Sequence, residues 1–470
     1  MQKNEEYIVE IIDNGYKGEG IAKINNMPIF IPKTIKGEKV KIKVLKVLKN
    51  EAYGKALQIV EPSEFRREID CSTYSKCGGC NLRHINYKET LNMKKAIVQN
   101  NMKKAGLYDV LVKDCIGMEN PFYYRNKLQY PVGYQDGRTL MGVFAERSHR
   151  IIETKECMLQ NKLLQEIAEH IFSFILENNI PVYDEEKQEG EIRHIYLRIG
   201  IKTNEVMAVL VTNKQKITKE DELVDYIITK YAQVKTIVKN INPKSTNVIL
   251  GKENIVLYGT GYIEDELLGY RFKISPMSFY QVNPIQTEKL YLKAIKEADL
   301  KGNETIFDLY CGIGTIGICA SKYAKKLYGI ETIKEAIEDA KENADINNIK
   351  NAEFIVGNVE EELPKLLEKE KINPDVVFLD PPRKGCDKVA LDTLLKLRPQ
   401  KIVYISCNSA TLARDLKILS KEYEINGIIP VDMFPFTAHV ECVALMGRKE
   451  SWETVDITAL HRFNKIEKKL

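Results

Sequence analysis

Residues 308–317 read Asp-Leu-Tyr-Cys-Gly-Ile-Gly-Thr-Ile-Gly, and this stretch decides the fold of the C-terminal part of the chain. It closes a strand-like run at 305–310 and opens a helical pattern at 316–323, with glycines spaced G-x-G-x-x-G. Glycine lets the backbone approach a ligand closely, and Glu331, at the end of the next strand-like run, can accept hydrogen bonds from ribose hydroxyls. The pattern serves enzymes that bind dinucleotides and enzymes that bind S-adenosylmethionine, so both classes stay open at this point.

Strand-like and helical patterns alternate around this stretch. Strand-like runs lie at 305–310, 326–330, 352–356 and 376–379, and helical runs lie at 287–298, 316–323 and 333–347. This order predicts a doubly wound parallel sheet with helices on both faces. We therefore expect an α/β Rossmann-like domain over residues 276–450.

The fourth strand-like run ends in Asp380-Pro-Pro-Arg383. Methyltransferases that use S-adenosylmethionine place an Asp/Asn-Pro-Pro element beside the transferred methyl group, which favours the methyl donor over a dinucleotide. Enzymes that methylate exocyclic amines usually have an aromatic residue after the prolines, so Arg383 indicates another target atom. A turn that merely ends the strand is the structural alternative.

Cys407 follows the β-branched run 401–406 and precedes a helical pattern at 409–416. A thiol at the C-terminal edge of a parallel sheet lies where such sheets bind their ligands. A helix N-terminus favours the thiolate, which is the nucleophilic form. The alternative is a small buried cysteine without a chemical role.

Glu441, in the next-to-last strand-like pattern, is expected to lie on a neighbouring strand of the sheet and to face the same crevice as Cys407. A thiolate and an ionised carboxylate suit methylation of a pyrimidine at C5, because the thiolate adds at C6 and the carboxylate then removes the C5 proton. Glu441 could instead form an ion pair with Arg383 or Arg414. His439 is expected to be a packed or hydrogen-bonded histidine and not a catalyst.

Cys71, Cys77 and Cys80 lie within ten residues of each other, and two glycines precede the third cysteine. Three unligated thiols in so short a cytosolic segment would be unusual, so a metal site is predicted. Cys157 is the candidate fourth ligand, since Cys115 lies within a strand-like stretch. Four cysteines suit zinc or an iron–sulfur cluster, and their spacing does not choose between the two.

Residues 1–60 contain eleven lysines, no arginine and seven acidic residues, whereas the whole chain carries a net charge of +4. Four short strand-like runs in this segment predict a small β-barrel. In the run 39–44, lysines alternate with aliphatic residues, which places ammonium groups on the outer face, where they could contact phosphates. A solvated lysine-rich surface explains the charge equally well.

The chain of 470 residues is long enough for two to four domains, and 44% hydrophobic with 29% charged residues is typical of a globular protein. It has no signal-like start and no apolar stretch that could span a membrane, so we expect a cytoplasmic protein that does not bind membranes. The first expected unit is a barrel over residues 1–61, followed by an α+β central domain in two segments, 62–90 and 120–275. Between these segments, residues 91–119 form a helical connection packed on the catalytic domain. The catalytic domain covers 276–450, and a polar tail covers 451–470.

Taken together, these motifs resemble the RNA uracil-C5 methyltransferases that carry an N-terminal TRAM domain, and more closely those that form 5-methyluridine in 23S ribosomal RNA. The resemblance runs from about residue 5 to 446. It rests on the cysteines at 71, 77, 80 and 157, Ser-Phe-Tyr-Gln-Val-Asn at 278–283, the glycine stretch, Asp-Pro-Pro-Arg-Lys-Gly at 380–385, Ile-Ser-Cys-Asn at 405–408 and His-Val-Glu at 439–441.

The resemblance implies an OB-like TRAM barrel, a central RNA-binding domain with a [4Fe–4S] cluster (zinc being the alternative), and a Rossmann-like domain that uses S-adenosylmethionine. The cluster ligands would be Cys71, Cys77, Cys80 and Cys157. Donor binding would fall to Gln281, Tyr310, Glu331 and Asp380, with Asn358 as a weaker contact. Cys407 would be the nucleophile and Glu441 the base. The expected substrate is 23S ribosomal RNA, with the transfer RNA T-loop as the alternative, and the expected state is a monomer.

Two positions depart from the family pattern. Ser409 stands where the family usually has a proline after Ser-Cys-Asn, and Asn358 stands where an acidic residue is common. The first leaves the nucleophile intact but is unexplained by the sequence. Because Asn358 replaces an acidic residue, its role in donor binding is the least strongly implied among the five donor-binding residues.

Three other functions compete with this interpretation. An RNA cytosine-C5 methyltransferase would place a cysteine directly after the Asp-x-Pro element, but Arg383 stands there and Cys386 comes later. A non-catalytic RNA-binding assembly factor would be expected to have lost Cys407 or Glu441. An iron–sulfur redox enzyme that binds a dinucleotide would leave the Asp-Pro-Pro element unexplained.

Overall fold

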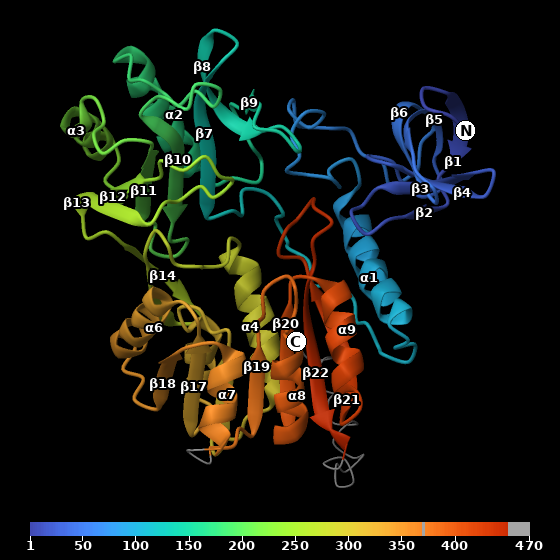
Figure 1. Ribbon diagram of the computed structural model, residues 1–470, viewed down its shortest axis with the longest axis vertical. Coiled ribbons are helices and arrows are strands. Elements are labelled where there is room, and N and C mark those ends of the chain that lie inside the picture. Colours follow the sequence, from blue (N-terminus) through green and yellow to red (C-terminus); the bar gives the residue numbers. More distant parts are fainter. Residues whose placement is uncertain (369–371, 450–470) are drawn as a thin grey trace.

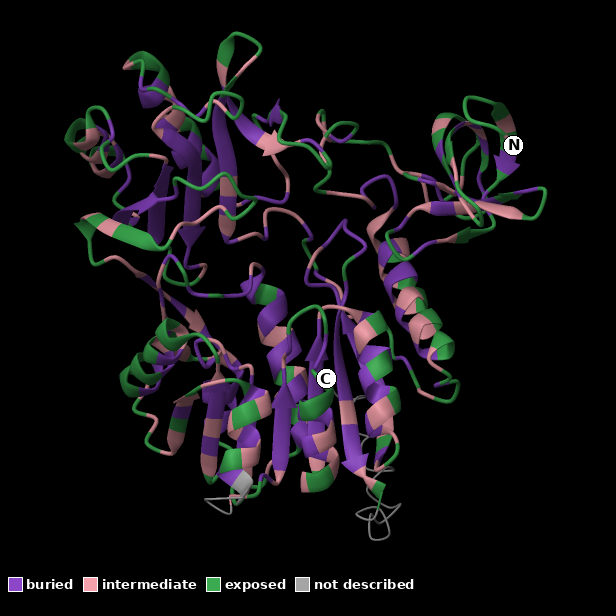
Figure 2. Cartoon of the chain, viewed as in Figure 1, coloured by how far each residue is buried: buried purple, intermediate pink, exposed green. Residues whose placement is uncertain are grey.

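The structure is a computed structural model that describes residues 1–368 and 372–449, arranged as three sheet-containing bodies (Figure 1). The tail expected at 451–470 lies outside the described residues. In the described part, no helix is long and apolar enough to cross a membrane. Figure 2 shows that the inner strands of the two larger sheets are buried along their length.

The N-terminal body is one six-stranded sheet in the order β1-β5-β6-β4-β3-β2. Its strands are β1 (Glu6–Glu10), β2 (Asp13–Asn14), β3 (Gly20–Ile24), β4 (Met27–Ile31), β5 (Lys39–Val47) and β6 (Ala52–Glu61). The predicted alternation in β5 is confirmed, because Val40, Ile42 and Val44 are fully buried. The outer lysines are not a free cationic row, however, since Lys39 pairs with Glu61 (3.1 Å) and Lys41 pairs with Glu6 (2.9 Å).

The central body is a mixed sheet in the order β13-β12-β11-β10-β7-β8-β9, covered on one face by two helices. Its elements are β7 (Lys127–Gln135), β8 (Arg138–Phe144), β9 (Ile151–Glu153), α2 (Lys162–Glu177), β10 (Ile192–Ile199), β11 (Val206–Thr212), α3 (Glu220–Lys230), β12 (Val234–Ile241) and β13 (Glu253–Gly259). Ile195 and Leu197 point into the core under the helices, whereas Tyr196 packs in the core shared with the C-terminal body. Both faces of β10 are therefore buried, and one face of the central sheet packs against the C-terminal body.

The C-terminal body has the order β18-β17-β16-β19-β20-β22-β21, with β18, β17, β16, β19 and β20 parallel, as predicted. The last strand in sequence, β22, inserts antiparallel between β20 and β21. The elements are β14 (Ile263–Leu267), β15 (Tyr270–Ile274), α4 (Pro284–Ala298), β16 (Thr305–Leu309), α5 (Thr315–Ser321), β17 (Lys326–Glu331), α6 (Lys334–Ile346), β18 (Ala352–Val356), α7 (Val359–Glu368), β19 (Val376–Leu379), α8 (Lys388–Leu397), β20 (Lys401–Ser406), α9 (Ser409–Leu419), β21 (Tyr423–Val431) and β22 (Glu441–Arg448).

Helix α1 (Tyr87–Lys104) connects the N-terminal half to the catalytic domain and runs along α9 (Figure 1). The side chain of Asn86 caps its N-terminus by accepting from the backbone N–H of Glu89 (2.9 Å). Val98 and Met102 on this helix enter the hydrophobic core of the catalytic domain. The helix therefore belongs to the C-terminal body by packing, although it precedes the central domain in sequence.

Candidate active site

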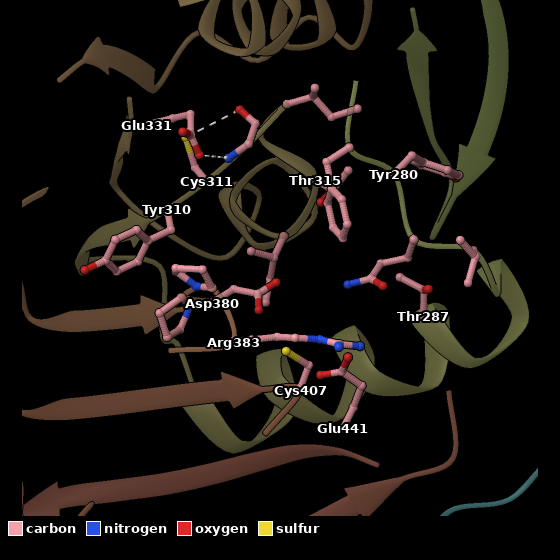
Figure 3. A pocket seen from close by; sticks show the side chains of 18 of the residues that line it. Tyr280, Thr287, Tyr310, Cys311, Thr315, Glu331, Asp380, Arg383, Cys407 and Glu441 are labelled. Carbon is pink, nitrogen blue, oxygen red and sulfur yellow. Dashed lines mark hydrogen bonds between the residues drawn. The ribbon is translucent and has the colours of Figure 1, made fainter. Parts of the chain in front are cut away.

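One cavity of about 740 Å³ lies at the carboxyl edge of the parallel strands and opens toward the central domain. All seven residues predicted for donor binding and catalysis line it: Gln281, Tyr310, Glu331, Asn358, Asp380, Cys407 and Glu441. Ligands of open α/β sheets bind at this edge. Figure 3 shows residues from several strands and loops converging on the cavity.

The glycine stretch forms the turn between β16 and α5, as the sequence predicts. Tyr310, Gly312 and Gly314 all have positive φ (65°, 55° and 81°), a conformation that glycine adopts without strain and tyrosine does not. The backbone N–H of Gly312 donates to Oε2 of Glu331 (3.2 Å), which ties this turn to the end of β17. Oε1 of Glu331 accepts from the N–H of Thr332 (2.7 Å). The carboxylate is thus held in place at the cavity wall with lone pairs left for a ligand.

Asp308 lies behind the glycine turn and Glu360 lines the cavity, and sequence analysis assigned a role to neither residue. Asp308 is fully buried, its Oδ2 accepts from the N–H of Gly317 (3.0 Å), and its Oδ1 has no partner in the described part of the chain. Burial raises the pKa of Asp308 to about 8. The hydroxyl of Tyr310 donates to Oε1 of Glu360 (3.0 Å), which orients its ring over the cavity. Asp308 could have been found as the last polar residue of a buried strand before the glycine turn.

Cys407 and Glu441 come together because β22 is antiparallel to β20. Ser406 at the end of β20 pairs with Cys442, so the first residue of β22 lies beside Cys407 at the same edge of the sheet. In Figure 3 the sulfur of Cys407 and the carboxyl group of Glu441 point into the same space, and the side chain of Arg383 crosses the cavity between them and Asp380. Methylation of a pyrimidine at C5 would need a thiol and a carboxyl group placed together in this way.

The charges of this group depend mainly on burial. Burial, followed by the charge of Asp380, raises the pKa of Glu441 to about 8, while Arg383 lowers it. Burial also raises the pKa of Asp380 to about 7. The pKa of Cys407 is raised to about 11 by burial and by both carboxyl groups, against the opposing effect of Arg383. In the ligand-free site, burial and the two acids therefore favour the thiol form of Cys407 over the thiolate that nucleophilic attack needs.

Two structural alternatives fail in the described part of the chain. Glu441 forms no ion pair there with Arg383 or Arg414, and Arg414 pairs with Asp415 (2.7 Å). The side chain of His439 is exposed and has no hydrogen bond among the described residues, so of the two predicted alternatives the packed one holds. His439 lies in an edge-to-face contact with Phe434, at the mouth of the cavity.

A second cavity of about 750 Å³ adjoins the first and shares Arg383, Cys407 and His439 with it. It lies where the N-terminal sheet, the cysteine-rich loop, α1 and the catalytic domain meet. Its other polar and aromatic lining residues include Tyr16, Lys17, Lys33, Asn101, Lys104, Asn408 and Ser409. Cys407 therefore lies at the junction of two cavities, one facing the glycine turn and one facing the N-terminal body.

Ser409 has a partner that accounts for its presence in place of proline. Its hydroxyl accepts from Nδ2 of Asn101 on α1 (2.8 Å), and the residue is buried at the first position of α9. Proline at this position would hold the helix start through its fixed φ, and here a hydrogen bond from a neighbouring helix holds it instead. The turn that carries Cys407 is thus fixed to α1.

The four predicted metal ligands lie in one region, each of them partly exposed. Burial raises the pKa of Cys80 to about 12, and the charges of Cys157, Cys77 and Cys71 contribute to that shift, so the four thiols lie within electrostatic reach of each other. Nevertheless, among residues 1–368 and 372–449 no three His, Cys, Asp or Glu side chains are arranged to hold a metal ion. The donor chemistry fits zinc or an iron–sulfur cluster, but the structure does not show the metal site.

Sheet order, glycine turn and cavity together define a methyltransferase of the α/β class. The family model for tRNA (uracil-5-)-methyltransferase matches residues 86–449, and the TRAM domain model matches residues 2–57. The chain belongs to this family of RNA methyltransferases and carries an N-terminal TRAM domain.

Relatives agree with this assignment over nearly the whole chain. An uncharacterized RNA methyltransferase of Clostridium acetobutylicum is 50% identical over 452 residues, covering 95% of this chain and 98% of its own. Another, from Clostridium tetani, is 47% identical over 447 residues, covering 95% and 97%. Among solved structures, the tRNA (uracil-54, C5)-methyltransferase of Pyrococcus abyssi, in complex with S-adenosyl-L-homocysteine, matches with 29% identity and a TM-score of 0.75, covering 94% of this chain and 100% of its own.

Proposed function

We propose that this enzyme methylates C5 of a uridine in RNA, using S-adenosylmethionine and a covalent adduct at Cys407. The observation that carries the proposal is the placement of Cys407, directly after β20, beside Glu441, the first residue of the adjacent β22, in one cavity with the five residues assigned to donor binding. When bound, S-adenosylmethionine would supply an electrophilic methyl group. Gln281, Tyr310, Glu331 and Asp380 would hold it, with Asn358 at the edge of the site.

The proposed reaction uses the thiol and the carboxyl group in turn. The Cys407 sulfur forms a bond to C6 of uracil, and the electron pair of the C5–C6 double bond moves into an enolate. C5 would then accept the methyl group that S-adenosylmethionine supplies, with S-adenosylhomocysteine as the product. Glu441 removes the C5 proton, the double bond re-forms, and the bond between sulfur and C6 breaks. Arg383, which lowers the pKa of both groups, stabilises the anionic forms that each step requires.

The uridine must leave its base stack to reach Cys407, so the substrate strand is single-stranded or refolds on binding. We propose 23S ribosomal RNA as the substrate, since a TRAM domain and a cysteine-rich loop more often accompany the uracil-C5 methyltransferases that act on this RNA. The T-loop of transfer RNA is the second candidate, because the archaeal neighbour that covers 94% of this chain is a tRNA uracil-54 methyltransferase. We propose that the enzyme acts as a monomer.

The test is a map of 5-methyluridine in ribosomal and transfer RNA from a strain that lacks the gene. We expect one or two uridines to lose the methyl group and to regain it when the wild-type gene is restored. The Cys407→Ala variant should not restore it, although it should still bind RNA. An unchanged 5-methyluridine map, or methylation restored by Cys407→Ala, would contradict the proposal.

We also propose that Cys71, Cys77, Cys80 and Cys157 bind a [4Fe–4S] cluster. Support comes from the four-thiol donor set and from the mutual electrostatic influence of the cysteines. The protein purified without oxygen should be brown and contain about four iron atoms per chain, and Cys77→Ala should lose them. Zinc in place of iron would favour the alternative, and no metal at all would refute the proposal.

A further inference from the structure

The wall of the active-site cavity opposite the catalytic domain is cationic and has no acidic partner. It is formed by Arg125, Lys127 and Gln129 at the start of β7. Neither Arg125 nor Lys127 forms an ion pair or a side-chain hydrogen bond with any residue in the described ranges, and Nε of Arg125 is buried without a partner. Both side chains are partly buried, and a cation shielded from water without a counter-charge costs free energy, so the arrangement suggests that a ligand supplies the negative charge.

The strand geometry aims these side chains at the cavity. Residues alternate along β7, so Leu128 packs in the core under α2 while Lys127 and Gln129 face the cavity. Lys127 lies directly opposite Arg198 in the pairing of β7 with β10. Arg198 is only 2% exposed, donates from Nη1 to the backbone oxygen of Ser278 (2.9 Å), and leaves its Nε without a partner.

The pKa of Lys127 also indicates that this wall is cationic and lacks an acidic partner. Burial, then the charges of Arg198 and Arg125, lower the pKa of Lys127 to about 8, and no carboxyl group contributes to the shift. The charge of Arg125 also contributes to lowering the pKa of His439, which places the guanidinium close to the cavity mouth near Cys407. Lys127 therefore lies close to two guanidinium groups, those of Arg198 and Arg125, which disfavour its charged form.

The backbone holds this wall against the donor-binding segment. The N–H of Asn126 donates to the backbone oxygen of Val282 (3.0 Å), and Nδ2 of Asn126 donates to the backbone oxygen of Gln281 (3.1 Å). Arg125 and Lys127, on either side of Asn126, are therefore fixed relative to Gln281. An anion bound here would lie next to the cavity that receives the base.

We propose that Arg125 and Lys127 bind the RNA phosphodiester group adjacent to the uridine that enters the active site. The inference rests on the proposed function and adds the position of the backbone next to the target nucleotide. A phosphate matches the charge of the wall, and contact with two cations fixes the register of the strand without reading its sequence. The carboxylate of the methyl donor is the other anion that could reach this wall.

The test compares Lys127→Gln with Lys235→Gln, which removes the same charge from an exposed position on β12 outside the cavity. A short fluorescein-labelled oligouridylate is titrated at several KCl concentrations from about 0.05 to 0.2 M. Lys127→Gln should raise Kd roughly tenfold and reduce the slope of log Kd against log [KCl] by about 0.7, the value for one phosphate contact on a single strand. Lys235→Gln should change neither quantity, and Lys127→Arg should restore most of the affinity.

Binding of S-adenosylhomocysteine, measured by calorimetry, separates the two anions. Its Kd should stay within about twofold of wild type in Lys127→Gln. An unchanged salt slope for RNA would overturn the inference, as would weaker S-adenosylhomocysteine binding with unchanged RNA binding. If Lys127→Gln loses the phosphate contact but the wild-type enzyme methylates no RNA, the proposed function fails, and only the phosphate contact itself remains of the inference. If wild type methylates RNA and the slope is unchanged, only the inference fails.

Discussion

At the scale of single residues, the proposed chemistry depends on a carboxyl group whose pKa the fold raises. Glu441 is 3% exposed and its pKa is about 8, yet as a base it must accept a proton from C5. A sulfonium cation bound beside Asp380 would stabilise the carboxylate, as Arg383 already does. Glu441 is thus expected to ionise fully only when S-adenosylmethionine is bound. The carboxylate form of Glu441 would then be confined to the enzyme that carries the methyl donor.

The first prediction concerns Glu441→Gln. Methyl transfer should still occur, but the C5 proton should remain, so the bond between Cys407 and C6 should not break. We expect a band that survives denaturation on a gel, containing both protein and RNA. The double variant Cys407→Ala/Glu441→Gln should give no such band. A Glu441→Gln enzyme that turns over repeatedly without an adduct would contradict the assignment of the base.

The second prediction concerns pH. Glu441 and Cys407 both have raised pKa values, of about 8 and about 11, and both act in the deprotonated form. The kcat/KM for RNA, which reports ionisations of the free enzyme, should therefore rise with pH between about 6 and 8.5. Arg383 lowers both pKa values, so Arg383→Gln should move this rise to higher pH. A profile that is flat over this range would contradict these ionisations.

Sequence reasoning succeeded for residues whose motif is local and failed for those brought in by tertiary packing. The glycine turn and Cys407 follow from short-range patterns, and their strands and helices form where predicted. Arg125 and Lys127 lie in a different domain from the glycine turn, and no local pattern links the two. The raised pKa of Cys407 likewise depends on Asp380 and Glu441, which approach it only in the folded sheet.

At the scale of elements, α1 holds the loop between β21 and β22 in place. Nζ of Lys94 forms a fully buried ion pair with Asp432 and donates to the backbone oxygen of Phe434 (3.0 Å). The hydroxyl of Tyr87 donates to Oδ2 of Asp432 (2.8 Å). This loop leads directly into Glu441, so a helix from the N-terminal half of the chain positions the carboxyl group that we propose as the base.

The third prediction compares two lysines of α1. Lys94→Met leaves the buried carboxylate of Asp432 without its cation, which should lower the free energy of unfolding by about 3–5 kcal/mol. Lys95→Met removes only an ion pair with Asp114, whose side chain is 95% exposed, and should cost less than about 1 kcal/mol. Urea unfolding of both variants measures the difference. Equal losses would show that the buried pair does not hold α1 to the loop.

One helix start was predicted correctly at a residue that a side-chain cap fixes. The helical pattern expected at 409–416 is observed as α9 (Ser409–Leu419), and Asn408 caps its start by accepting from the N–H of Ala410 (3.1 Å). The antiparallel insertion of β22 did not follow from the alternating pattern, since strand direction depends on the connection before it. That insertion is nevertheless what places Glu441 beside Cys407.

At the scale of the whole molecule, the two adjoining cavities place Cys407 between the TRAM domain and the central domain. The TRAM domain contributes Tyr16, which is 63% exposed, and Lys17, whose ammonium group lies 5.2 Å from the centre of that ring. An exposed aromatic ring beside a cation suits a stacked base and its phosphate. The lysines on the outer face of β5 are a poorer candidate surface, since Lys39 and Lys41 are paired with acids.

The fourth prediction tests which TRAM surface meets the RNA. Tyr16→Ala and Lys17→Gln should each raise the KM for RNA, by roughly five- to tenfold for the loss of one stacked base or one phosphate contact. Binding of S-adenosylhomocysteine should not change, because neither residue lines the cavity at the glycine turn. Lys23→Gln, on the exposed side of β3, is the matched control and should behave as wild type. If Lys23→Gln weakens RNA binding as much as Lys17→Gln does, the TRAM domain acts through its overall charge and not through the cavity beside Cys407.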